Sequence, residues 1–209
     1  MQLSVQPIAA LDEDRRAALI GRDSGVDAER ETVREIIDAV RADGDPALFE
    51  YASRFDDVEI EAIDISDQVA GAAEAVAPEV REAIETAAEN IREFHREEVP
   101  SDWRDDFDGR ELGRRFRPLE RVGIYAPGGT AAYPSSVLMG VIPAKVAGVE
   151  EVAVATPPAD EIHPATLAAI DIADADAVYQ IGGAQAIAAL AYGTESVDPV
   201  QKIAGPGNR

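Results

Sequence analysis

The chain has 209 residues, 46% of them hydrophobic, and its 41 acidic and 19 basic side chains give a formal net charge of −22. It contains no cysteine, which excludes disulfide bonds, a thiol nucleophile and a thiolate metal site. No apolar run is long enough to span a membrane, so we expect no membrane partner. The negative charge argues against nucleic acid as a partner, because polyphosphate would be repelled.

The acidity favours a protein adapted to high salt. The acids are spread along the chain rather than collected in a tail, and only Lys145 and Lys202 are lysines. Carboxylates keep a surface hydrated, while screening at molar salt reaches only about 3 Å and weakens their repulsion. The first residues lack the basic and apolar regions of a signal peptide, so we expect a cytoplasmic location.

Residues 1–119 are predicted to form a mostly helical region that ends in a hairpin. Asp45 before Pro46 is expected to cap a helix, Ser66 is a candidate cap for another, and Pro78 should begin the longest helix. Apolar residues recur at helical spacing through that last segment. They are Val80, Ile84, Ala87, Ile91 and Phe94.

The end of this region has a different character. Asp108-Gly109, between two short strand-like arms, is a strong hairpin signal. A basic island follows, made of Arg110, Arg114, Arg115, Arg117 and Arg121. Two interpretations are open, an anion site or pairing with nearby carboxylates, and we favour the pairing.

Residues 120–209 are predicted to form a parallel α/β sheet domain. "RVGIYA", "EVAVATPP", "AVYQIGG" and "KIAGPGN" are short runs rich in Val and Ile. Alanine-rich stretches at 133–148, about 163–175 and 184–192 separate them and are expected to be helices. Strand and helix in alternation predict right-handed crossovers and a sheet buried on both faces. The expected fold class is therefore α/β, with a helical region followed by a Rossmann-like domain.

A ligand site is predicted where these strands end. Each run stops at glycine or proline, and the carboxyl ends of parallel strands share one edge, where open α/β sheets bind ligands. Tyr125, Gln185 and Asn208 follow or end strands there. Each has a plain alternative: a core aromatic, a solvent-facing helix-start residue and a turn residue. The G-x-G-x-x-G dinucleotide motif is absent.

No catalytic or metal-binding residue can be selected from the sequence. His95 lies on a charged helix and His163 in an expected loop, and neither has a second histidine at helical spacing. No Ser-His-Asp group or carboxylate pair stands out among so many acids.

The same strand-end motifs resemble a known family. "RPLERVGIYAPGGTAAYPSSVLMGVIPAKVAGVEEV", "YQIGGAQAIAALAYGTESV" and "KIAGPGN" are very similar to histidinol dehydrogenase, over most of residues 113–208. The resemblance is to the N-terminal half of that enzyme. Gly140, where asparagine is common in the family, is a departure expected to loosen its own helix, the one that follows the Pro-Gly-Gly turn.

The resemblance implies an NAD-dependent, zinc-dependent homodimer that oxidises L-histidinol to L-histidine through histidinal in histidine biosynthesis. It assigns the NAD contacts to Tyr125, Gln185 and Asn208 and makes residues 120–209 the NAD-binding domain. Residues 1–119 then belong to a first α/β domain. The family's zinc ligands and its Glu-His acid/base pair would lie beyond residue 209, so we expect the chain alone to be inactive. A nucleotide-binding module without catalysis, or a relative acting on another small alcohol, are the alternatives.

Overall fold

The structure is a computed structural model, and it describes residues 7–20, 26–128 and 132–206. The chain divides into two compact units, Met1–Glu35 and Ile36–Arg209. The first holds a 3-10 helix, η1 (Ile8–Ala10), the helix α1 (Glu13–Ile20) and the start of α2 (Val26–Asp43), which continues into the second unit. The functional division at residues 119 and 120 stays a prediction. No helix in the described ranges is long and apolar enough to cross a membrane.

The second unit is mostly helical up to residue 96. Its helices there are α3 (Asp45–Tyr51), the π-helix η2 (Ala52–Asp56), α4 (Ser66–Val69), α5 (Ala72–Ala75) and α6 (Pro78–Arg96). Pro46 lies in the first turn of α3 and Pro78 in the first turn of α6, where proline's missing N–H is not needed. These two predicted helices are confirmed.

Both predicted side-chain caps are wrong, because tertiary partners take their place. Asp45 does not cap α3: its carboxylate accepts hydrogen bonds from the backbone N–H (3.2 Å) and hydroxyl (2.5 Å) of Ser196. The N–H of Asp45 donates instead to the carboxylate of Glu195, at 2.9 Å. The Ser66 hydroxyl accepts from the N–H of Val178, at 2.9 Å, rather than from its own helix.

Four parallel strands form the central sheet, as predicted. They are β3 (Arg121–Tyr125), β4 (Glu151–Thr156), β5 (Ala177–Gln180) and β6 (Lys202–Ala204), in the spatial order β5-β4-β3-β6. Three further helices lie between them in sequence: α7 (Pro134–Val146), α8 (Pro164–Ala173) and α9 (Gly183–Tyr192). The strand order reverses between β3 and β6, because the chain builds outward from β3 and then returns to its other side.

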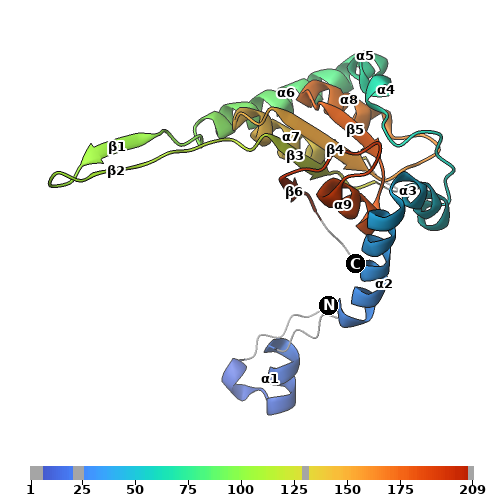
Figure 1. The fold of residues 1–209 in the computed structure, drawn as a ribbon, viewed down its shortest axis with the longest axis horizontal. Coiled ribbons are helices and arrows are strands. Elements are labelled where there is room, and N and C mark those ends of the chain that lie inside the picture. Colours follow the sequence, from blue (N-terminus) through green and yellow to red (C-terminus); the bar gives the residue numbers. More distant parts are fainter. Residues whose placement is uncertain (1–6, 21–25, 129–131, 207–209) are drawn as a thin grey trace. The chain divides into compact units, whose positions relative to one another are not determined.

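Each face of the sheet has its own core, as Figure 1 shows for the helices on its two sides. Val122, Ile124, Val152, Val154 and Val178 pack against α6, α7 and α8. Ala153, Ala155, Ala177 and Tyr179 on the other face pack against α9, α3 and the end of α2. The strands β3, β4 and β5 are thus buried on both faces, which explains why they read as nearly continuous apolar runs, whereas the edge strand β6 is mostly exposed.

A separate hairpin joins α6 to β3. The strands β1 (Trp103–Asp106) and β2 (Glu111–Arg114) pair antiparallel, from Trp103 opposite Arg114 to Asp106 opposite Glu111. Asp108 and Gly109 both have positive φ, as a two-residue turn with the twist of a hairpin requires. The predicted hairpin is confirmed.

Candidate functional site at the carboxyl edge of the sheet

The four strands end along one edge of the sheet, because all of them run in the same direction. Tyr125 is the last residue of β3, Thr156 of β4, Gln180 of β5 and Ala204 of β6. Helix α9 begins at this edge, with only two residues between its start and the end of β5. The predicted common edge is therefore present.

Tyr125 lies where the strand order reverses. Its half-buried side chain reaches the start of α9, where its hydroxyl accepts a hydrogen bond from the N–H of Gly183, at 3.2 Å. On its other side is the end of β6: a Cβ on Gly205 would lie 2.4 Å from the carbonyl oxygen of Tyr125. Only glycine allows that approach. Tyr125 is thus held between the start of α9 and the end of β6 at the reversal point, where ligands of open α/β sheets bind.

Gln185 lies in the first turn of α9 and is buried. Only 3% of its surface is exposed, so the alternative of a solvent-facing helix-start residue is wrong. Its amide makes no side-chain hydrogen bond to another described residue, and it can both donate and accept. A buried amide at the edge, close to the residue that contacts Tyr125, fits a role in holding a polar ligand.

Asn208 lies outside the described residues, so its proposed cofactor contact remains a prediction. The described chain ends two residues earlier, at Pro206, just after the close approach of Gly205 to Tyr125. The polypeptide that leads to Asn208 therefore starts at the reversal point.

The sequence did not predict a cavity that lies at the same edge of the sheet. A cavity of about 260 Å³ lies between the ends of β3 and β4, with Gly128, Thr156, Pro157 and His163 in its lining. His163 was expected in a loop, but it caps α8, and its Nδ1 accepts the N–H of Ala165 at 3.1 Å. The signal for Thr156 was its position at the end of an apolar run, directly before Pro157-Pro158.

No metal site is found in the part of the chain that the structure describes. None of its groups of His, Asp and Glu brings three potential ligands together, and the chain has no cysteine. The described residues therefore do not by themselves form a zinc centre. The two histidines serve local structure: His163 caps α8, and His95 pairs with Glu98, with Nδ1 and Oε2 2.5 Å apart.

Fold and site together define a doubly wound α/β protein with a ligand edge of the type that binds dinucleotides. Comparison with known proteins gives the family. Residues 21–209 match the family model for histidinol dehydrogenase. Histidinol dehydrogenases of Natronomonas pharaonis and Haloarcula marismortui are each 65% identical over 207 residues, which is 99% of this chain. The chain belongs to the histidinol dehydrogenase family.

A solved structure agrees with this assignment. The crystal structure of histidinol dehydrogenase from Elizabethkingia anophelis matches with a TM-score of 0.82 and 35% identity, covering 87% of this chain and 43% of that one. The chain spans about half the length of the curated relatives, with 49% of each of these two proteins covered.

Proposed function

We propose that the chain supplies the NAD-binding edge of an enzyme that oxidises L-histidinol to L-histidine through histidinal. The observation that carries this proposal is the position of Tyr125, fixed between α9 and β6 where the strand order reverses. Bound NAD supplies the hydride acceptor for such an oxidation. The membership in the histidinol dehydrogenase family supports the choice of substrate.

In this proposal three residues contact the bound NAD. Tyr125 provides an aromatic surface whose hydroxyl is already oriented by the Gly183 N–H. Gln185 presents a buried amide from α9, and Asn208 a second amide beyond β6. Gly205 leaves the backbone beside Tyr125 free of a side chain, so that a dinucleotide can lie against that backbone.

We propose that the 209-residue chain does not by itself catalyse the oxidation of L-histidinol. Alcohol oxidation needs a group that accepts the hydroxyl proton, worth about 10²–10⁴ in rate, and the described residues form no metal cluster that could replace it. The family's zinc and acid/base chemistry would come from residues outside this chain. We further propose a cytoplasmic homodimer as the working form.

Calorimetric titration with NAD tests the binding edge. Tyr125→Ala should weaken binding by roughly tenfold, about 1.4 kcal/mol, because the platform is lost. Gln185→Ala should weaken it similarly. Tyr192→Ala is the matched control, since this exposed tyrosine lies at the far end of α9. Equal NAD affinity in the Tyr125 variant and the control would contradict the assignment.

Absorbance of NADH tests the second part. The purified chain, with NAD, L-histidinol and zinc in molar KCl, should give no NADH above the rate without protein. NADH formation that increases in proportion to protein and is lost in Gln185→Ala would show that the chain carries its own catalytic groups.

A further inference from the structure

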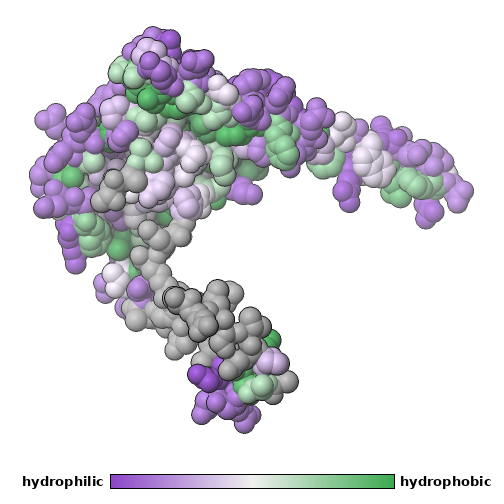
Figure 2. Space-filling model, turned by 180° about the vertical axis from the view of Figure 1, so that it is seen from behind, coloured by the Kyte–Doolittle hydropathy of each residue, from purple (hydrophilic) through white to green (hydrophobic). Residues whose placement is uncertain are grey.

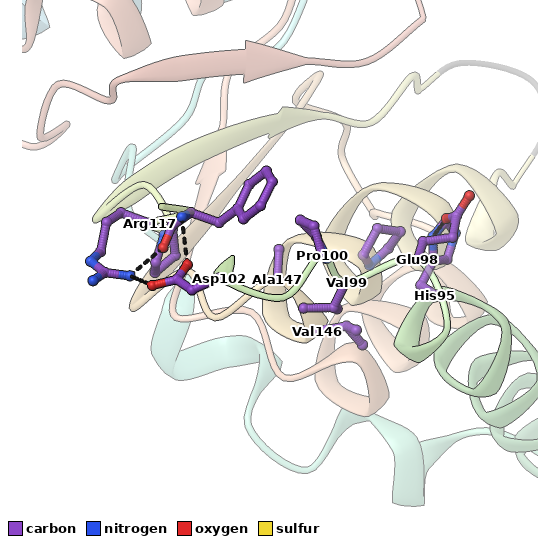
Figure 3. A pocket seen from close by; sticks show the side chains of 11 residues that line it. His95, Glu98, Val99, Pro100, Asp102, Arg117, Val146 and Ala147 are labelled. Atoms are coloured by element: carbon purple, nitrogen blue, oxygen red, sulfur yellow. Dashed lines mark hydrogen bonds and ion pairs between the residues drawn. The ribbon is translucent and has the colours of Figure 1, made fainter. Parts of the chain in front are cut away.

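Two cavities of the described chain differ in whether their polar side chains already have partners. The larger, of about 470 Å³, lies at the base of the hairpin, where α6 and α7 end. Figure 3 shows Asp102 and Arg117 on one side of it and His95 and Glu98 on the other. Asp102 pairs with Arg117 at 3.1 Å, and His95 pairs with Glu98 at 2.5 Å. The charged groups of this cavity therefore need no ligand.

The smaller cavity is the one between the ends of β3 and β4, which we call the strand-end cavity. Thr156 and Thr166 line it, and only 2% and 4% of their surfaces are exposed. Neither hydroxyl makes a hydrogen bond to another described residue. A buried polar group that is left unbonded costs free energy, so each such group calls for an explanation. Two of them in one cavity point to a ligand that completes their hydrogen bonds.

The strand-end cavity belongs to the same edge of the sheet as Tyr125. Thr156 ends β4, which pairs with β3 in parallel. Pro157 packs on the turns after both neighbouring strands, because a Cβ on Gly128 or Gly182 would lie 3.1 or 3.0 Å from its own Cβ. Gly182 directly precedes the residue whose N–H binds the Tyr125 hydroxyl. A ligand extended along this edge therefore reaches both the cavity and Tyr125.

The polar groups of the cavity suit a sugar better than a free phosphate. A threonine hydroxyl both donates and accepts, as the neighbouring hydroxyls of a ribose require. His163 accepts the N–H of Ala165 through Nδ1, so Nε2 carries the proton of the neutral ring and is a donor. Glu161, also in the lining, accepts hydrogen bonds but repels a phosphate. The net charge of −22, on the largely hydrophilic surface that Figure 2 shows, disfavours a free anion further.

We propose that the strand-end cavity holds the adenosine ribose of NAD, with the Thr156 hydroxyl bonded to the ribose 2′-hydroxyl. This inference rests on the proposed NAD-binding edge and adds residues to it. In dinucleotide-binding α/β folds an Asp or Glu bonds this hydroxyl, and the neutral Thr156 takes that place at the end of β4. The volume of about 260 Å³ is below the roughly 300–1,000 Å³ of sites that enclose a whole drug-sized ligand. The cavity therefore suits one nucleoside part of the cofactor.

Calorimetric titration with AMP and with 2′-deoxy-AMP tests the ribose contact. The wild-type chain in molar KCl should bind AMP about fivefold more tightly, the effect of one hydrogen bond. Thr156→Val, which keeps the shape but removes the hydroxyl, should lose this preference, and Thr156→Ser should keep it. Thr86→Val is the matched control, because Thr86 is exposed on α6. A wild type that binds neither nucleotide, or both equally, would overturn the proposal, as would an unchanged preference in Thr156→Val.

A Tyr125→Ala variant separates this proposal from the proposed NAD-binding edge. It should bind NAD more weakly but still prefer AMP, because the ribose contact is made by Thr156. If Tyr125→Ala weakens NAD binding while the wild type does not distinguish the two nucleotides, the NAD-binding edge stands and the ribose assignment is wrong. If the preference is present while Tyr125→Ala binds NAD as well as the Tyr192→Ala control, the ribose assignment stands and the role of Tyr125 is wrong.

Adenosine 2′,5′-bisphosphate tests the preference for a sugar hydroxyl over a phosphate. The wild type should bind it roughly tenfold more weakly than AMP, because its 2′-phosphate would lie near the Glu161 carboxylate. Glu161→Gln should narrow the difference, whereas Glu82→Gln, the same charge change on the exposed side of α6, should not. A bisphosphate that binds as tightly as AMP would show that the cavity accepts a phosphate, and the ribose assignment would be wrong.

Discussion

Asp56, at the end of the π-helix η2, carries a buried carboxylate oxygen with no hydrogen-bond partner within the described chain. Burial raises the pKa of this carboxyl above its ordinary value, because the charged form loses its hydration. A raised folded-state pKa means that the stability linked to this group is present in acid. It is lost as the pH rises through the folded-state pKa.

Replacing this carboxylate with its neutral isostere should therefore stabilise the protein at neutral pH. We expect Asp56→Asn to raise the melting temperature at pH 7 by a few degrees, about the effect of 1 kcal/mol on a chain of this size. The gain should be smaller at pH 4 than at pH 7, because the raised pKa means that the native carboxyl becomes protonated, and so neutral, more readily in acid. Asp57→Asn is the control, since Asp57 is exposed and its left-handed backbone suits asparagine equally. A gain that is the same at both pH values would contradict burial as the cause.

At the scale of elements, the packing of α7 on β3 depends on a glycine. A Cβ on Gly140 would lie only 2.4 Å from Cγ2 of Ile124, so any larger residue must push the helix away from the sheet. Helix α7 nevertheless continues through Gly140 without a break. The low helix propensity of this glycine is therefore opposed by the close packing of α7 on β3 that it permits.

Gly140→Ala should thus destabilise the protein, although alanine is the better helix former. The gain in helix propensity is about 1 kcal/mol, and overpacking costs about 1–3 kcal/mol. We expect a net loss of about 1 kcal/mol in chemical denaturation. In an Ile124→Ala background, which removes Cγ2, the same change should cost less or become favourable. An equal cost in both backgrounds would show that the contact does not matter.

At the scale of the whole molecule, the net charge of −22 sets how stability depends on salt. The ion pairs in the described chain involve mostly exposed side chains, such as Arg81 with Glu85 on α6, and each contributes little. Repulsion among the unpaired carboxylates then dominates. The two relatives that are 65% identical are halophilic, which agrees with the high-salt interpretation of the composition.

The melting temperature should therefore rise steadily as KCl is increased from low to molar concentration, because screening reduces this repulsion. A variant with three exposed acids neutralised, two in α6 and one at its C-cap (Glu82→Gln, Glu93→Gln and Glu97→Gln), should reach the same stability at a lower salt concentration. Thermal unfolding followed by circular dichroism measures both. A melting temperature that stays flat or falls across the range would refute the high-salt interpretation.

Local sequence patterns by themselves determined the strands of the sheet, the hairpin and two of the candidate site residues. The Val- and Ile-rich runs ending in glycine or proline predicted β3 to β6 as parallel strands. In β3, β4 and β5 burial on both faces needs apolar residues at almost every position, whereas β6 is short and largely exposed. Asp108-Gly109 predicted the hairpin, since its turn requires two residues that tolerate positive φ. The strand-end motifs also led to Tyr125 and Gln185 as candidates for the site.

Tertiary structure alone decided how these pieces meet. The order β5-β4-β3-β6 places Tyr125 beside β6, whose sequence lies far away, and nothing local to either strand encodes that pairing. The burial of Gln185 likewise depends on which face of the sheet α9 covers. Asp45 and Ser66 were assigned as caps and instead bind Ser196 and Val178. The spacing of apolar residues along the chain predicts which side chains are buried. Long-range packing decides which groups they contact, so a polar side chain can bond to a tertiary donor instead of one in its own helix.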